Sequence, residues 1–328
     1  MSGFAATLRA ILRGEKTDSD IKSFLEALNA DGLNSEHVRM GVEIMRENMT
    51  PVDIPGAIDI VGTGGTGLHT LSISTASALV CAGAGAKVAK HGNRAASSLT
   101  GTADTLSVLG VNLAITPEKA AQCVKHAGIG FLFAPNHHPA MRFVGPARKA
   151  IGARTIFNLL GPMSNPARTK RMLVGVCDNE WRRLMAEAFA ELDMEHVWVV
   201  HGVDGLDEIT TTGPTFIYEV KAGQINEFTI SPESYGIDLV SIESLRGGHP
   251  EENAAALTAL LSGEHSDYRD IVLLNSGAAL MIAGLAKDIP SGINLAANAI
   301  DSGKAKDCLL YTSPSPRDRT RSRMPSSA

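Results

Sequence analysis

Short apolar runs alternate with helical stretches from about residue 55 onward, and this alternation restricts the fold more than any other feature of the chain. Five runs have the length of buried strands: 57–61, 86–89, 129–133, 172–177 and 196–200. Helix-like stretches lie between them, at 75–84, 103–109, 117–126 and 180–192. Because strands that alternate with helices are typical of a mainly parallel sheet with crossover helices, the sequence predicts an α/β fold.

The first fifty residues predict helices alone. Apolar side chains recur at helical spacing in 21–28 and again in 38–49. We therefore expect a small helical N-terminal domain over 1–52 and a larger α/β domain, with the mainly parallel sheet, over 53–310.

The C-terminal part of the α/β domain is expected to hold a hairpin at 215–230 and long helices at 251–261 and 267–285. The stretch 294–305 is helix-like and then runs into residues 311–328, which are rich in serine, proline and arginine. Such a segment is either a disordered interaction tail or a sequence foreign to the protein. We favour the second interpretation and assign the segment no function.

Composition excludes several classes of protein. The 328 residues are 44% hydrophobic and 20% charged. A disordered chain would combine low hydrophobicity with a high net charge, so this class is excluded. No apolar run reaches the roughly 18 residues of a membrane span, and no secretory cleavage pattern follows the N-terminal segment. A cytoplasmic protein without membrane association is expected. The formal net charge of −5 argues against a nucleic-acid partner, and four widely spaced cysteines predict reduced thiols.

A glycine-rich turn follows the first predicted strand. Residues 59–67 read DIVGTGGTG, and a cluster of hydroxyl residues leads from there into the helix predicted at 75–84. Glycines let the backbone approach a ligand closely, and the free N–H groups of a helix N-terminus attract anions. A structural turn would explain the glycines alone, but together with the hydroxyl cluster they favour a phosphate or pyrophosphate site.

Two further polar loops follow predicted strands. Residues 90–98, KHGNRAASS, bring a lysine and an arginine that can neutralise a phosphate. The loop after 196–200 brings three carboxylates, Asp204, Asp207 and Glu208, and oxygen ligands of this kind suit Mg²⁺. Each loop alone also fits a solvated turn. Because the carboxyl ends of parallel strands meet at one edge of a sheet, the three segments together predict a magnesium pyrophosphate site.

A fourth polar segment follows the strand predicted at 129–133. Residues 134–142, APNHHPAMR, lead through Arg148 to 154–162, RTIFNLLGP. Adjacent histidines chelate a metal poorly, so a turn before a helix is the expected role of His-His-Pro. Arg148 is able to bind a carboxylate ligand with two hydrogen bonds, although the position alone favours an exposed salt-bridge arginine.

In this order and spacing, KHGNR with the following serines, FLFAP and HPAM, RTIFNLLGP, and the HG and GLDE loop resemble the anthranilate phosphoribosyltransferase family over about residues 4–305. The resemblance implies an α/β fold of the nucleoside phosphorylase type. It implies transfer of phosphoribose from 5-phosphoribosyl 1-pyrophosphate (PRPP) to the amine of anthranilate in tryptophan biosynthesis, with release of pyrophosphate. It also implies Mg²⁺ as the cofactor and a homodimer.

Carried over position by position, the resemblance implies a donor, an acceptor and a metal site. The donor site for PRPP comprises Gly62, Gly65, Thr66, Thr70, Ser72, Ser74, Thr75, Lys90, His91, Gly92, Asn93, Arg94, Ser97, Ser98 and Thr102. The acceptor site for anthranilate comprises Gly62, Asn93, His138 and Arg148, and Mg²⁺ is assigned to Ser74, Asp207 and Glu208. Lys90, Asp207 and Glu208 are expected to act electrostatically, and no general base is identified.

Three positions depart from the family's usual pattern. The family usually has Asp where this chain has Thr66 and Asn where it has Ser72, and it commonly has Lys at Leu99. Thr66 removes a carboxylate from the pyrophosphate region, and Ser72 replaces an amide with a single hydroxyl. We expect a working site with altered affinity for PRPP or Mg²⁺.

Two alternative functions are considered beside this one. A pyrimidine nucleoside phosphorylase would share the fold and bind phosphate at a comparable glycine turn, but KHGNR and the Asp207-Glu208 pair favour the transferase. A non-catalytic nucleic-acid-binding relative would have eroded glycine motifs and a basic surface, whereas this chain keeps GTGG, KHGNR and the acidic pair and is acidic.

Overall fold

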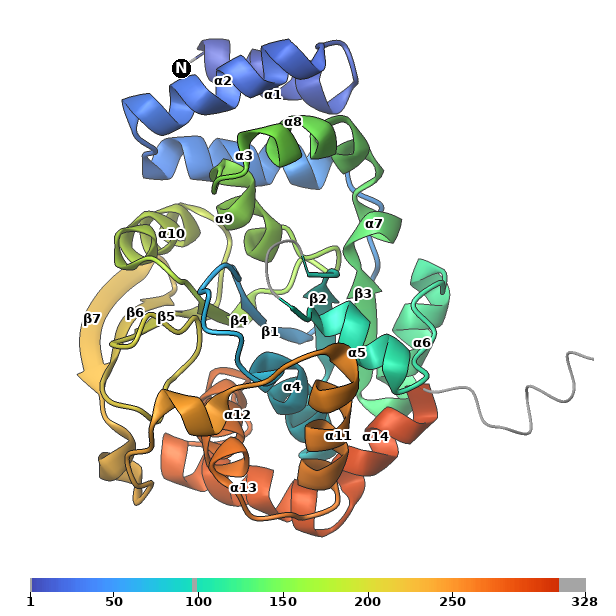
Figure 1. Ribbon diagram of the computed structural model, residues 1–328, viewed down its shortest axis with the longest axis vertical. Coiled ribbons are helices and arrows are strands. Elements are labelled where there is room, and N and C mark those ends of the chain that lie inside the picture. Colours follow the sequence, from blue (N-terminus) through green and yellow to red (C-terminus); the bar gives the residue numbers. More distant parts are fainter. Residues whose placement is uncertain (1, 96–98, 313–328) are drawn as a thin grey trace, which may run out of the picture.

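A seven-stranded sheet with helices on both faces forms the centre of the protein (Figure 1). The computed structural model describes residues 2–95 and 99–312. The strand order is β3-β2-β1-β4-β5-β6-β7, parallel from β3 to β5 and antiparallel from β5 to β7. The strands are β1 (Ile58–Gly62), β2 (Val88–Gly92), β3 (Ile129–Phe133), β4 (Arg171–Gly175), β5 (His196–Gly202), β6 (Thr215–Lys221) and β7 (Gln224–Ile230).

The predicted α/β fold is confirmed. All five strands predicted for the parallel part are present, with ends shifted by a few residues. The predicted hairpin is β6 and β7, which are joined by a tight turn at Ala222 and Gly223, both with positive φ. Glycine accepts such a conformation without strain, so the turn chemistry agrees with the observed hairpin.

Helices cover both faces of the sheet, and the longest of those described is α12 with 16 residues. They are α1 (Ser2–Leu12), α2 (Asp18–Asp31), α3 (Ser35–Glu47), α4 (Ile73–Gly83), α5 (Thr102–Val108), α6 (Pro117–Ala127), α7 (Ala134–His137), α8 (Gly145–Ile151), α9 (Ile156–Met163), α10 (Asn179–Glu191), α11 (Pro250–Leu261), α12 (Asp267–Ile282), α13 (Ile289–Asp301) and α14 (Lys304–Thr312), with 3₁₀ turns η1 (Pro139–Phe143), η2 (Pro232–Tyr235) and η3 (Ile242–Leu245). Every helix predicted from periodicity is present. The Thr116 side chain caps α6 as expected, by accepting from the Lys119 N–H at 3.4 Å.

The two faces of the sheet enter different apolar cores. On β4, Met172 and Val174 contribute to one core and Leu173 to the other, as the two-residue period of a strand requires. The core that contains Leu173 also holds residues of α4 and α11–α14, and the other core holds residues of α1–α3 and α8–α10. The sheet is therefore covered on both faces, which agrees with its mainly parallel strands.

The three N-terminal helices share their core with a later part of the chain. Residues of α1–α3, α8, α9 and α10 form one buried cluster, and Figure 1 shows α8 beside the N-terminal helices at the top of the molecule. After β3 the chain thus crosses into this helical layer and returns to the sheet at β4. The division into domains at residue 52 stays a prediction.

The C-terminal part differs from expectation in its helices. The helix-like stretch 294–305 belongs to two helices, α13 and α14, separated at Gly303, whose φ is +77°. The second of these continues to Thr312, so Tyr311 and Thr312 are helical. The rest of the segment predicted to be foreign, 313–328, lies outside the described residues.

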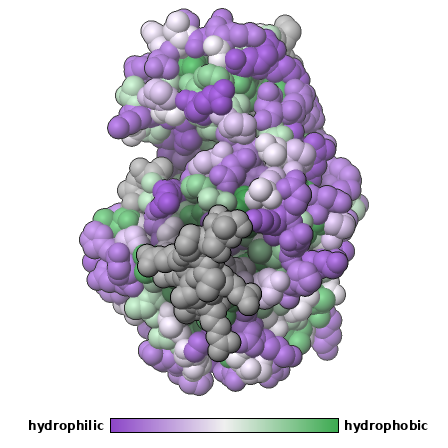
Figure 2. Space-filling model, turned by 90° about the vertical axis from the view of Figure 1, so that its right-hand side faces the viewer, coloured by the Kyte–Doolittle hydropathy of each residue, from purple (hydrophilic) through white to green (hydrophobic). Residues whose placement is uncertain are grey.

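The surface turned toward the viewer in Figure 2 is mostly hydrophilic, including the helical layer at its top. Among the helices that the structure describes, none combines the length and apolar character needed to cross a membrane.

Candidate active site

A cavity of about 370 Å³ lies at the carboxyl ends of the central strands. Its wall contains every predicted donor-site residue within the described ranges, together with Asp207, Glu208 and Arg148. Ser97 and Ser98, which were also predicted to contact the donor, lie outside the described residues. The motifs after β1, β2 and β5 are thus brought together as expected for ligand sites in α/β sheets.

The glycine turn after β1 is shaped around Asp207. Asp207 Oδ2 accepts a hydrogen bond from the Gly64 N–H at 2.7 Å. A Cβ at Gly62 would lie 2.2 Å from the same oxygen, and a Cβ at Gly175 would lie 1.6 Å from the Asp207 backbone carbonyl. Because neither position has room for a side chain, these two glycines allow the acidic loop to approach β1 and β4 closely.

Glu208 is buried and Asp207 is half-buried, and removal from solvent raises the pKa of each carboxyl. The pKa of Glu208 rises to about 8, first through burial and then through the neighbouring charge of Asp207. Ser74 opposes this rise by hydrogen bonding to Glu208 through its N–H and its hydroxyl. Two carboxylates in this setting repel each other and favour a bound cation.

The predicted magnesium ligands fit Mg²⁺ as a substrate-associated ion. In the described part of the chain no three His, Cys, Asp or Glu side chains gather into a metal site. However, Mg²⁺ is commonly bound by one or two carboxylates together with substrate phosphates. The Asp207 and Glu208 carboxylates with the Ser74 hydroxyl supply such a partial set. The third carboxylate of the loop, Asp204, turns away, and its Oδ2 accepts from the hydroxyls of Thr210 and Thr212.

Lys90 forms the floor of the donor region. Its side chain is 2% exposed, and its Nζ donates to the Ile60 carbonyl at 2.7 Å and to Ser74 Oγ at 3.3 Å. Burial lowers its pKa, while the charges of Asp59 and then Glu208 oppose that effect. The ammonium is therefore held in place by protein groups before any substrate binds.

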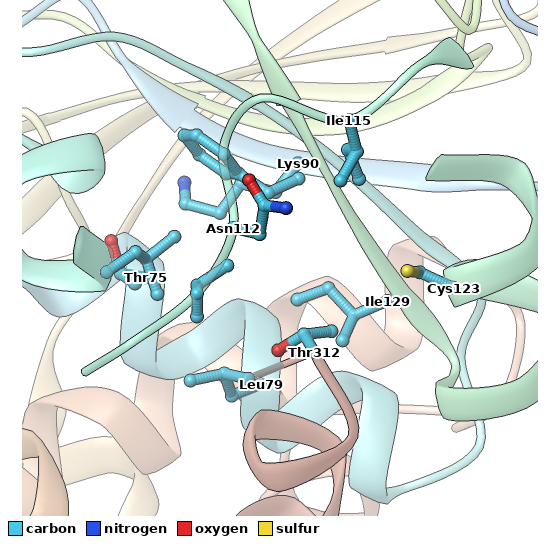
Figure 3. A pocket seen from close by; sticks show the side chains of 11 residues that line it. Thr75, Leu79, Lys90, Asn112, Ile115, Cys123, Ile129 and Thr312 are labelled. Atoms are coloured by element: carbon cyan, nitrogen blue, oxygen red, sulfur yellow. The ribbon is translucent and has the colours of Figure 1, made fainter. Parts of the chain in front are cut away.

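A smaller cavity of about 50 Å³ lies behind Lys90. Figure 3 shows it with Thr75 and Cys123 on opposite sides and Thr312 below Lys90. Lys90 and Thr75 line both cavities. Like other long cationic side chains, Lys90 buries its methylene groups while its charged end meets polar partners.

The loop that follows β2 is organised by Asp104 of α5. The Asp104 carboxylate accepts from the Arg94 guanidinium at 2.8 Å and from the backbone N–H groups of Ala95 and Gly101 at 2.9 and 3.0 Å. These bonds connect Arg94 and Ala95 to the start of α5, and Asn93 and Arg94 line the cavity.

Residues of α8 and α9, among them the predicted acceptor residue Arg148, form another part of the cavity wall. Arg148 is half-buried, donates to Asn158 Oδ1 at 3.3 Å, and places its guanidinium carbon 5.9 Å from the centre of the Phe157 ring. Within the described residues it makes no ion pair with a carboxylate, which differs from the exposed salt bridge that its position alone favoured. Arg148 is thus oriented by uncharged neighbours, and its guanidinium charge is available to pair with an anionic ligand.

His138 does not line the cavity. It is 5% exposed, and its ring lies 5.1 Å from that of His91, which does line the cavity. Burial lowers the pKa of His138 to about 4 and holds the pKa of His91 well below its usual value. Both imidazoles are neutral near pH 7, and His138 contacts the site through His91.

Comparison with known proteins agrees with this geometry. Residues 55–306 match a family model described as the a/b domain of a glycosyl transferase family. An anthranilate phosphoribosyltransferase from Parvibaculum lavamentivorans is 52% identical over 305 residues, which cover 93% of this chain and 89% of that protein. The chain belongs to the anthranilate phosphoribosyltransferase family.

Solved anthranilate phosphoribosyltransferases share its fold. The enzyme from Thermus thermophilus superposes with a TM-score of 0.88 at 40% identity, covering 94% of this chain and 93% of the other. The enzyme from Saccharomyces cerevisiae in complex with PRPP and Mg superposes with a TM-score of 0.86 at 28% identity, covering 94% and 91%. The fold predicted from the resemblance is therefore confirmed.

All three departures from the anthranilate phosphoribosyltransferase pattern line the cavity. Thr66 Oγ1 accepts from the Leu68 N–H at 3.2 Å and so stabilises the turn. Ser72 Oγ lies 3.0 Å from Thr105 Oγ1. Leu99 is 49% exposed at the rim. The first two hydroxyls thus have structural partners within the protein.

Asn158 lines the cavity and was not singled out from the sequence, although it orients Arg148. The sequence favoured an unrelated loop position for His69 over a donor in this region, but His69 lines the cavity with a φ of +51°, a conformation that is uncommon outside glycine. Arg154 is not part of the cavity wall, but it donates to the Gly65 carbonyl at 2.6 Å. The RTIFNLLGP motif, which contains Arg154 and Asn158, was the available signal.

Proposed function

We propose that the protein transfers the phosphoribosyl group of PRPP to the amine of anthranilate, giving N-(5-phosphoribosyl)anthranilate and pyrophosphate in tryptophan biosynthesis. One observation carries the proposal: the glycine turn, the Lys90 loop, the acidic pair and Arg148 line a single cavity. The same cavity thus offers groups suited to a phosphate and a cation suited to a carboxylate, as a reaction between these two substrates requires.

The donor would bind against the strand ends. The first turn of α4 lines the cavity with Ile73, Ser74 and Thr75, and its free N–H groups favour the negative charge of a pyrophosphate. Lys90 and Arg94 add positive charge on the neighbouring loop. Asp207 and Glu208, with Ser74, would hold Mg²⁺, which neutralises charge on the pyrophosphate when it is bound.

The acceptor would bind between α8 and the Lys90 loop. Arg148 is able to pair with the anthranilate carboxylate through two N–H groups, and Asn93 offers an amide on the opposite wall. The aromatic amine of anthranilate is neutral near pH 7, so it needs orientation more than deprotonation. Catalysis would then consist of stabilising the charge that develops on pyrophosphate and of aligning the amine with the anomeric carbon.

The test is a fluorescence assay of anthranilate consumption with PRPP and Mg²⁺. Consumption that requires both additions is the expected result. Lys90→Met should abolish most of the activity, whereas Glu219→Gln, at a hydrogen-bonded position on β6 outside the cavity wall, should retain it. A folded wild-type protein that consumes no anthranilate at high PRPP and Mg²⁺ would overturn the proposal.

The same preparation tests the alternative enzyme. Incubation with uridine or thymidine and inorganic phosphate would release free base if the protein were a pyrimidine nucleoside phosphorylase, and we expect none. Cytoplasmic location and a homodimer stay predictions, and sedimentation of the purified protein tests the second.

A further inference from the structure

The adjacent strands β1 and β2 pair with each other over a much shorter length than they pair with their other neighbours. The β1–β2 register contains one residue pair, Ile58 with Val88, whereas β1–β4 and β2–β3 each pair over five residues. Beyond Ile58 the facing backbone groups need other partners, because buried N–H and C=O groups are almost always hydrogen bonded. Side chains must therefore enter the gap between these strands.

Asp59 and Asn165 fill one side of this gap, and both are completely buried. Asp59 Oδ1 accepts from the His91 N–H at 3.3 Å. Asn165 Nδ2 donates to Asp59 Oδ2 at 2.7 Å and to the Ala89 carbonyl at 2.8 Å. Asn165 Oδ1 accepts from the Ala167 N–H at 2.8 Å, which fixes the orientation of the amide. The pair replaces backbone bonds that β1 and β2 would otherwise exchange.

Lys90 fills the other side of the gap. Its Nζ donates to the Ile60 carbonyl of β1 at 2.7 Å, so the lysine also takes a backbone group that would have entered the sheet. The Asp59 charge stabilises the buried ammonium and is the largest of the charges that do so. Asp59 thus acts on the Lys90–His91 segment twice, through the His91 N–H and through the charge of Lys90.

We propose that Asp59 and Asn165 are positioning residues that hold Lys90 and His91 at the donor end of the cavity. Neither residue lines the cavity itself. The inference rests on the proposed function, because it takes Lys90 as a group that binds the pyrophosphate of PRPP. If the wedge formed by Asp59 and Asn165 is lost, β2 can move toward β1 and carry both side chains away from the donor.

Two variants test this role. Asp59→Asn removes the charge and leaves one of the two donors, Asn165 Nδ2 or the His91 N–H, facing an amide nitrogen instead of an acceptor oxygen. Asn165→Ala removes all three hydrogen bonds of the amide and leaves the charge of Asp59 in place. We expect each variant to raise the KM for PRPP by roughly tenfold or more, the size typical of losing a partner that orients a binding group. The KM for anthranilate should change by less than about threefold, because Arg148 lies on α8, away from this gap.

Glu219→Gln is the control, since it alters a carboxylate that bonds to His196 and Trp198 at the far part of the sheet. Calorimetric titration of each folded variant with PRPP in the absence of Mg²⁺ gives a second readout. We expect weaker binding of PRPP in Asp59→Asn and Asn165→Ala, and unchanged binding in Glu219→Gln. If Asp59→Asn does not fold, Asn165→Ala decides the question.

Unchanged PRPP binding in a folded variant would overturn the positioning role, as would equal changes in both KM values. Failure of the proposed function would look different. In that case the wild-type protein would consume no anthranilate, while the calorimetric comparison would still report whether Asp59 and Asn165 support PRPP binding.

Discussion

Gly62 faces Asp207 so closely that any side chain at this position has to displace the carboxylate. A Cβ at Gly62 would lie 2.2 Å from Asp207 Oδ2 and 2.8 Å from Asp207 Cγ, whereas ordinary contact begins at 3.4 Å. The carboxylate must therefore retreat by roughly 1 Å. Because Oδ2 also accepts from the Gly64 N–H at 2.7 Å, a retreat of this size stretches that bond beyond hydrogen-bonding distance.

The loss can be converted into kinetics. A hydrogen bond to a charged group contributes about 1.5–3 kcal/mol, which corresponds to roughly ten- to hundredfold in an equilibrium constant. We expect Gly62→Ala to raise the KM for PRPP, and the Mg²⁺ concentration that gives half-maximal rate, by a factor in this range. The anthranilate fluorescence assay, run as separate titrations of PRPP and Mg²⁺, measures both quantities.

Gly3→Ala is the matched control, because a Cβ at Gly3 in α1 meets nothing within 4 Å. Its kinetics should equal those of the wild-type protein. If folded Gly62→Ala keeps the wild-type dependence on both PRPP and Mg²⁺, the position of Asp207 does not set the affinity of the donor site, and the reasoning is refuted.

The remaining predictions concern the two loop departures, the acceptor arginine and a buried histidine. Restoring Thr66→Asp together with Ser72→Asn should shift the apparent affinity for PRPP or Mg²⁺, and unchanged kinetics would contradict the role given to these positions. Arg148→Lys should raise the KM for anthranilate by roughly tenfold, because lysine lacks the planar pair of donors; an equal rise in the KM for PRPP would count against it. The pKa of His138 is lowered to about 4, so between that pH and about 6.5 the unfolded state binds more protons than the native state. This difference makes the free energy of unfolding rise with pH by roughly 3 kcal/mol across the window and fall again on acidification. Urea denaturation of His138→Gln at several pH values should show a smaller increase of the free energy of unfolding with pH. If the increase equals that of the wild-type protein, His138 is not its source.

The sheet could be predicted from the sequence because its strands are short, apolar and separated by clear helical patterns. The segment 134–163 could not. It forms α7, η1, α8 and α9, which are four to eight residues long and contain proline or glycine, too short for a helical period to be visible. Burial of their apolar side chains against α1–α3 stabilises these helices, and this tertiary contact is not visible in the local sequence.

The candidate site was predicted where its residues lie close together in one loop. The members of the glycine turn, and those of the acidic pair, are within a few positions of each other, although the hydrogen bond between Gly64 and Asp207 that joins the two loops spans 143 positions. Asp59 was visible as a charged residue inside an apolar strand, but its partner Asn165 lies 106 positions away, and no local pattern connects them. Asp204 is the opposite case. Its spacing suggested a third carboxylate beside Asp207 and Glu208, but its carboxylate accepts hydrogen bonds from the nearby hydroxyls of Thr210 and Thr212.

The path of the chain through the helical layer separates the two ends of the cavity in sequence. The wall residues between β3 and β4 are Ala134, Arg148, Phe157, Asn158, Gly161 and Pro162, whereas the other wall residues come from β1 and the glycine turn, the start of α4, the Lys90 loop, the start of α5, the acidic loop and Gly248. The wall that contains Arg148 is therefore one continuous segment of the chain. Exchanging 134–163 between relatives is a single genetic replacement, and it would alter acceptor choice while every residue of the donor loops is inherited unchanged.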